Sequence, residues 1–170
     1  MKKAITLFVA SLMMVLSAIP IFAADSKTRP IVQDINITEE EMMALEHVTG
    51  IYDASEPGSK ASGLILGGKL SLAKSGNNLI FTATTLGSTE VTKSGFTYVR
   101  LQRYINGGWS NYTSYVDQYS NSPTHSISKS VAAPKGYTYR VICEHYAEKP
   151  YLVIFKSTEK IYNVTATLSF

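Results

Sequence analysis

A thiol and an imidazole stand two residues apart at Cys143 and His145, and they are the nearest this sequence comes to a metal-binding pair. Side chains two positions apart in a strand point to the same face, so the pair could supply part of a zinc site. The other histidines, His47 and His125, are distant in sequence, and there is no second cysteine. We therefore expect no metal site and no cofactor, a buried and inert thiol at Cys143, and a partly buried strand position at His145.

The sequence contains none of the residue patterns that are typical of hydrolytic enzymes. None of the serines lies in the Gly-x-Ser-x-Gly turn that exposes the nucleophile of an α/β-hydrolase. Glycosidases need two facing carboxyl groups. The chain after residue 60 offers only Glu90, Asp117, Glu144, Glu148 and Glu159, which surface charge explains. We expect the protein not to be an enzyme.

Aromatic side chains give the only positive indication of function. Several gather on both sides of Asn106-Gly107, and we take four as candidate binding residues: Tyr98, Tyr104, Trp109 and Tyr112. Exposed rings with a polar edge suit the surfaces of sugars and proteins. The simpler alternative is that tyrosines favour strands and merely cover the outside of a sheet.

Alternation along a strand predicted over 96–105 assigns these rings to a face. Tyr98 and Tyr104 share one side, which we expect to be exposed. The opposite side, which we expect to be buried, holds Val99, Leu101 and Ile105. Arg103 also falls on that side, so we expect it to lie at a sheet edge or to reach outward.

The candidate binding residues lie in a part of the chain that is predicted to form β-strands. From residue 69 onward apolar residues alternate, and turn signals recur roughly every 8 to 12 residues, as in sandwiches and barrels. Asn106-Gly107 predicts a tight hairpin turn, and Glu148-Lys149-Pro150 predicts another, followed by a strand over 151–156. The sequence therefore predicts an all-β fold over 69–170, an immunoglobulin-like β-sandwich of about seven or eight strands.

The first 24 residues resemble a secretory signal. Lys2 and Lys3 precede an apolar run over 4–19, which is shorter than the roughly 20 residues of a membrane span. Pro20 and the small residues Ala23 and Ala24 follow, as at a cleavage site. We expect a secreted, extracellular protein with no stable membrane anchor after cleavage.

Removing both lysines leaves 14 basic against 13 acidic residues, a net charge of +1, which does not indicate a nucleic-acid partner.

Residues 25–68 are predicted to be an acidic leader ahead of the sandwich, with a short helix whose apolar side could dock on a partner but is expected by default to dock on the body of the protein. Thr38 and Glu41 have the spacing of a capping box, and they predict a short helix over 39–48. The Ser-, Gly- and Pro-rich residues that follow predict a linker up to residue 68. So short a helix has little apolar area to bury, so we expect the leader to be dispensable for folding.

The stretches 101–104, 106–109 and 136–141, together with His145, resemble a group of small secreted proteins of Gram-positive bacteria whose function is not known. The likeness covers roughly residues 70–164. It implies an immunoglobulin-like β-sandwich and nothing catalytic. In such a sandwich, Tyr137 or Tyr139 would fill the place of the tyrosine corner, although the paired cysteines of antibody domains are absent.

These patterns favour a secreted, non-catalytic module that binds an extracellular glycan or protein. The alternative is a structural surface protein that self-associates through its N-terminal leader or an edge strand.

Overall fold

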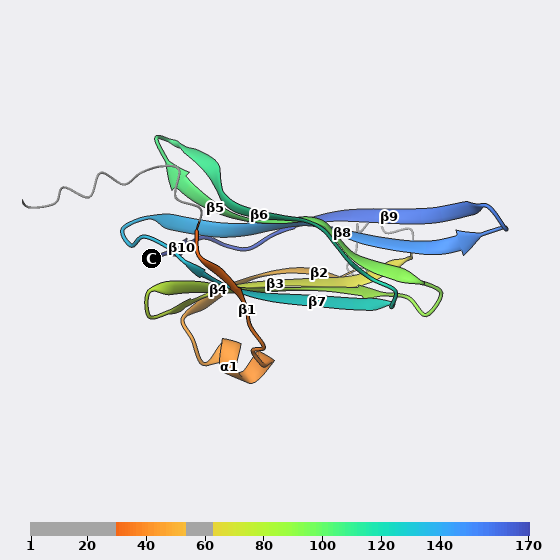
Figure 1. The fold of residues 1–170 in the computed structure, drawn as a ribbon, viewed down its shortest axis with the longest axis horizontal. Helices are drawn as coiled ribbons and strands as arrows, with labels where there is room; N and C mark the ends of the chain where they lie inside the picture. The colour runs from red at the N-terminus through yellow and green to blue at the C-terminus, as the bar shows by residue number, and fades with distance from the viewer. Residues whose placement is uncertain (1–29, 54–62) are drawn as a thin grey trace, which may run out of the picture.

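The computed structural model describes residues 30–53 and 63–170, so the predicted signal segment, 1–24, lies outside the described residues. Within them the chain forms ten strands and one short helix, arranged as two antiparallel sheets packed face to face (Figure 1). The prediction of an all-β sandwich is therefore confirmed.

The first sheet, sheet A, has the strand order β1-β7-β4-β3-β2. Its strands are β1 (Val32–Asp34), β7 (Thr124–Ala132), β4 (Asn78–Gly87), β3 (Ile65–Ser75) and β2 (His47–Asp53). The second sheet, sheet B, has the order β10-β8-β5-β6, and β9 also pairs with β8. Its strands are β10 (Leu168–Ser169), β8 (Thr138–Tyr151), β5 (Lys93–Ile105), β6 (Gly108–Ser120) and β9 (Phe155–Val164).

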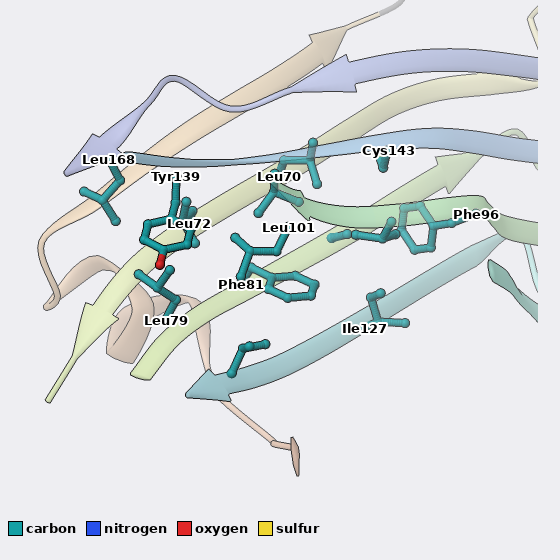
Figure 2. Close-up of a cluster of buried hydrophobic side chains, with 14 residues drawn as sticks. Leu70, Leu72, Leu79, Phe81, Phe96, Leu101, Ile127, Tyr139, Cys143 and Leu168 are labelled. Carbon is teal, nitrogen blue, oxygen red and sulfur yellow. The ribbon is translucent and has the colours of Figure 1, made fainter. Parts of the chain in front are cut away.

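The main core fills the space between the sheets, where alternate residues of each strand point inward (Figure 2). Its fully buried members include Leu70, Leu72, Phe81, Val99, Leu101 and Tyr139. Tyr139 is buried with its hydroxyl donating to the carbonyl of Pro134 at 2.8 Å, so its polar end is satisfied. The period-two pattern thus buries one face of each sheet and leaves the other face of sheet B to carry candidate binding residues.

The N-terminal helix, α1 (Glu39–Met43), is shorter than the predicted 39–48. The Thr38 hydroxyl accepts from the Glu41 amide at 3.1 Å, and the Glu41 carboxylate accepts from the Thr38 amide at 2.8 Å. The capping box therefore begins the helix where expected. The helix ends early because residues 47–53, which are rich in β-branched and aromatic side chains, pair along their whole length with β3.

The sandwich begins earlier than the predicted boundary at residue 69, because part of the leader belongs to sheet A. β1 pairs with β7, β2 pairs with β3, and β3 begins at Ile65 rather than at 69. Val32 and Val48 pack against the main core, while Met42 of α1 is buried on Ala73 and Ile80. These contacts lie 14 or more residues apart in sequence, so local patterns could not reveal them.

The turn predicted at 148–150 is also misplaced. β8 continues through Pro150 to Tyr151, and the chain turns at 152–154, with Leu152 at φ 59°. Pro150 lies beyond Glu148, the last residue of β8 that pairs with β5. A strand with a partner on one side only tolerates the missing N–H of proline. The apolar residues after Pro150 therefore form the end of a long β8–β9 hairpin.

Deleting residues 30–53 is expected to destabilise the protein strongly, because it removes two strands of sheet A. A finer test is Val48→Ala, expected to lower the free energy of unfolding by about 1–2 kcal/mol at about 0.8 kcal/mol per buried methylene-sized group. Ile51→Ala, on the opposite face of β2 and 70% exposed, is the matched control. Urea denaturation measures both, and equal effects of the two substitutions would contradict the placement of β2.

Candidate functional site

The outer face of sheet B gathers three of the four predicted binding residues. Across the β5–β6 hairpin, Tyr104 pairs directly with Trp109, and Tyr98 pairs with Val116. Tyr104 is 45% exposed, and Tyr98 and Trp109 are half-buried. The residues between them in β5, Val99 and Leu101, are fully buried on the inner side. The alternation predicted for β5 therefore holds, with Ile105 half-buried at its end.

A chain of stacked and hydrogen-bonded side chains crosses this face. The guanidinium of Arg140, from β8, lies 4.2 Å from the centre of the Trp109 ring, whose edge meets Tyr104 at a centroid distance of 5.3 Å. Arg140 Nε donates to Gln102 Oε1 at 2.9 Å, and Gln102 Nε2 donates to Asn111 Oδ1 at 2.9 Å. These contacts join β8, β5 and β6 and hold the arginine in a fixed orientation.

A second arginine is stacked in the same way. The guanidinium of Arg100 lies 4.2 Å from the centre of the Tyr98 ring. Burial is the main cause that raises the pKa of Tyr98, so its hydroxyl stays protonated at neutral pH. The ion pairs found among the described residues all use lysines, so neither Arg100 nor Arg140 forms one there, although the charge of Arg100 is among the causes that lower the pKa of Glu144. We call these residues the arginine–aromatic face: Tyr98, Arg100, Gln102, Tyr104, Trp109, Asn111 and Arg140.

Tyr112, the fourth predicted binding residue, does not lie on this face. Leu101 pairs with Thr113 whereas Gln102 pairs with Asn111, so Tyr112 is the extra residue of a β-bulge. The bulge turns its ring inward to meet Tyr139 at 6.0 Å, and its hydroxyl donates to the Ala132 carbonyl at 3.0 Å. No sequence signal marks this bulge, because it comes from the register between two strands.

Arg103 lies on the inner side, at the end of the sandwich near the β5–β6 turn. Its guanidinium is 5.3 Å from the centre of the Tyr112 ring and 4.6 Å from that of Tyr137. The bulge at Tyr112 and the residue before β8, Tyr137, therefore each supply an aromatic ring that a charged residue on the inner side of β5 can stack against.

The described chain buries a polar network around His145 that the sequence did not indicate. His145 is fully buried, not partly buried as expected, with Nδ1 2.8 Å from the Thr85 hydroxyl. That hydroxyl donates its single proton to the Gly95 carbonyl at 2.8 Å. Nδ1 must then carry the proton and donate to Thr85, which leaves Nε2 as an acceptor.

The acceptor nitrogen completes the network. Asn163 Nδ2 and Cys143 Sγ each lie 3.4 Å from His145 Nε2. The same amide group of Asn163 contacts the carbonyls of Gly50 and Gly68 at 3.3 and 3.4 Å. The network therefore links the two sheets, from β4 and β5 through β8 and β9 to β2 and β3.

Burial keeps both His145 and Cys143 in their neutral forms. Burial lowers the pKa of His145 to about 4, and burial raises the pKa of the Cys143 thiol far above its usual range. A neutral imidazole beside a protonated, inaccessible thiol is not an activated nucleophile. Among the described residues no group of three or more His, Cys, Asp or Glu side chains could hold a metal ion.

A groove of about 270 Å³ lies on the outer face of sheet A, beside α1. Its floor includes a row of hydroxyl residues paired across four strands: Thr49, Ser71, Thr82 and Ser128. Ile37 and Met42 form part of its wall. The groove has no stacked aromatic rings and no arginine among its lining residues, which distinguishes it from the arginine–aromatic face.

The stability of the protein is expected to fall as the pH drops from about 6.5 toward 4. In that range unfolded His145 binds a proton at its ordinary pKa, whereas the folded imidazole stays neutral until about pH 4. At about 1.4 kcal/mol per pKa unit, the full loss is about 3 kcal/mol. Urea denaturation at a series of pH values above about 5, where most carboxylates remain ionised, measures the first part of this loss, about 2 kcal/mol between about pH 6.5 and 5.

His145→Gln is the control for this pH dependence. It should lower the stability at neutral pH and also remove most of the slope. Burial lowers the pKa of His125 as well, so His125→Gln should remove a smaller part. A wild-type profile that is flat over this range would contradict a neutral buried imidazole.

Gly68→Ala is expected to disturb the network, because a Cβ there would lie 2.4 Å from His145 Nε2. Overpacking of this kind costs roughly 1–3 kcal/mol. Gly108→Ala is the matched control, since a Cβ at that position would meet nothing within 4 Å. Thermal melting of the two variants compares them, and a melting point of Gly68→Ala as high as that of the control would count against the packing described.

No protein-family model, curated protein or solved structure matches this chain. Among the described residues, no helix has the length and apolar character required to cross a membrane. The function must therefore be inferred from the geometry of the described residues.

Proposed function

We propose that this protein is an exported, non-catalytic β-sandwich that binds an acidic extracellular glycan on the arginine–aromatic face. The observation that carries the proposal is the pair of guanidinium groups, Arg100 and Arg140, each stacked on an aromatic ring and neither held in an ion pair among the described residues. A planar guanidinium binds carboxylate, sulfate or phosphate groups through two parallel hydrogen bonds.

The rest of the face suits a sugar chain. Tyr104 presents an exposed ring at the end of the hairpin, against which the apolar side of a sugar can pack. Gln102 and Asn111 supply amide groups that can bind hydroxyls, and their mutual hydrogen bond orients them. Stacking restrains both arginines before any ligand arrives, which reduces the entropy lost on binding.

The non-catalytic part of the proposal rests on the state of the reactive groups. Cys143 and His145 are buried and neutral. On the outer side of sheet B, Glu144 is bound to Lys160 at 2.9 Å and Glu148 to Lys156 at 2.7 Å. Both carboxylates have a lowered pKa, so neither is suited to act as a general acid at neutral pH.

Export is proposed from the signal-like residues 1–24. An immunoglobulin-like sandwich, as in the Gram-positive group that the sequence resembles, is proposed from the resemblance together with Tyr139. Its hydroxyl bonds to the backbone five residues upstream, at Pro134, as in a tyrosine corner.

Self-association through an edge strand is less favoured by the geometry. β6, an outer strand of sheet B, is interrupted by the bulge at Tyr112 and by Asp117, which has a φ of 53°. Such irregularities prevent continuous pairing with another chain. The side of β2 that faces away from β3 is partly covered as well. There the backbone carbonyls of Thr49 and Gly50 accept hydrogen bonds from the Ala166 amide and the Asn163 side chain.

The proposal predicts that the protein binds polygalacturonate, a carboxylated polysaccharide, more tightly than a neutral glucan. Binding should weaken as salt is raised, because the attraction between exposed charges is screened. Arg140→Gln and Trp109→Ala should each weaken it roughly tenfold, since each removes a charged hydrogen-bonding group or its support. Affinity electrophoresis or calorimetry measures the effect.

Lys69→Gln is the matched control, because it removes one positive charge from the outer face of sheet A, where the Lys69 side chain is 63% exposed. It should leave binding unchanged. All three variants should melt close to the wild type, since the side chains lie on outer faces. Equal binding of the neutral glucan, or an Arg140→Gln variant that binds normally, would refute the proposal.

A further inference from the structure

The β8–β9 hairpin ends in five consecutive large apolar residues, 151–155, that no other described part of the chain covers. Val153 is 101% exposed, Ile154 81% and Leu152 70%. The flanking Tyr151 and Phe155, which pair across the hairpin, are 61% and 57% exposed. Figure 1 shows this hairpin, in blue, extending past the ends of the other strands. We call residues 151–155 the apolar tip.

The five residues of the apolar tip form a continuous apolar patch, which the exposed surface of a protein ordinarily lacks. Scattered exposed apolar side chains are normal, but a continuous apolar patch marks a binding surface. Lengthening β8 beyond its last pair with β5, Lys93 with Glu148, is what carries these residues away from the core.

Basic side chains lie directly behind the tip on both strands. Lys149 is two residues before Tyr151, and Lys156 directly follows Phe155. Lys156 pairs with Glu148, which lies farther from the tip along β8, and Lys149 pairs with Glu90, which precedes β5. The Lys156 side chain remains 64% exposed. The order from the end of the hairpin inward is therefore aliphatic, aromatic and basic.

We propose that the apolar tip inserts into the interfacial layer of a lipid bilayer. The order of side chains matches the layers of a membrane surface. Aliphatic groups enter the acyl region, Tyr151 and Phe155 lie at the boundary, and lysines lie among the lipid headgroups. The strand rises roughly 7 Å from Lys149 to Tyr151, at about 3.3 Å per residue, which is within the depth of interfacial insertion.

Insertion stays shallow for a physical reason. The turn at 152–154 leaves backbone amide and carbonyl groups without ladder partners, and such groups are costly to bury in hydrocarbon. Lys149 and Lys156 oppose deeper entry because their ammonium groups must stay hydrated. The tip is therefore an anchor at the membrane surface and not part of a membrane-spanning structure.

A bilayer fits this shape better than a protein surface. The tip is convex and apolar around its end, so a flat protein surface would cover only part of it. A second copy of the chain offers the groove beside α1, but a groove on one sheet face would contact only one side of the tip and leave the rest of its five apolar side chains in water. A lipid layer surrounds an inserted tip from all sides and needs no complementary pocket.

The test is sedimentation of the protein with vesicles made of equal parts phosphatidylcholine and phosphatidylglycerol. The wild type should sediment with the vesicles. Val153→Ser combined with Ile154→Ser should weaken this binding tenfold or more, because the transfer of two large apolar side chains is lost. Ile51→Ser, which removes another apolar side chain that is 70% exposed, is the matched control and should bind normally.

Two further measurements separate insertion from surface attraction. A Val153→Cys variant labelled with a polarity-sensitive dye should report a less polar environment when vesicles are added, and the buried Cys143 should label slowly. Lys149→Gln combined with Lys156→Gln should weaken binding several-fold on the anionic vesicles only. Arg140→Gln should have no effect, which separates this proposal from glycan binding.

Four outcomes would overturn the proposal. These are a wild type that stays in solution with vesicles, a dye signal that does not change, and a double-serine variant that binds like the wild type. The fourth is a double-serine variant that abolishes self-association seen by light scattering without lipid, which would assign the tip to a second copy of the chain.

Discussion

The buried network around His145 is the constraint on which the sandwich depends. Its donors and acceptors come from β4, β5, β8 and β9, and they end on carbonyls of β2 and β3. A buried polar group is tolerated only when its hydrogen bonds are made, so each strand must keep its position relative to the others. Gly68 leaves room for the imidazole, since any side chain there would meet its ring. If only apolar contacts joined the two sheets, one sheet could shift against the other more easily, because apolar contacts are less directional than hydrogen bonds.

Two irregularities of sheet B decide what its outer face presents. Thr97 is an extra residue of β5 relative to β8, and Tyr112 is an extra residue of β6 relative to β5. Each bulge exchanges the inward and outward sets beyond it on its own strand. As a result, Tyr112 lies between the two sheets, and Trp109 stacks with Arg140 on the outer face of sheet B. The candidate glycan surface therefore depends on register as much as on composition.

The two proposed binding features lie at opposite ends of β8. Tyr139, near its beginning, pairs with Arg103 close to the β5–β6 turn, whereas Tyr151, its last residue, is the first residue of the apolar tip. A ligand on the arginine–aromatic face near that turn and a membrane surface at the tip would therefore not compete for space. A long, rigid hairpin suits this arrangement, because its backbone ladder holds the tip at a constant distance from the sandwich.

Local residue patterns determined much of the secondary structure. Asn106 and Gly107 both take positive φ, so the hairpin turn is where its dipeptide predicts, and Thr38 caps α1 through its own side chain. Local patterns also placed Tyr98 and Tyr104 on one face, because alternation along a strand is a short-range rule. Only the tertiary structure decided that 47–53 is a strand, that Tyr112 points inward, that His145 is buried and that 152–154 is an exposed turn. Each of these depends on partners distant in sequence, and the free energy of pairing and burial with such partners outweighs local propensity.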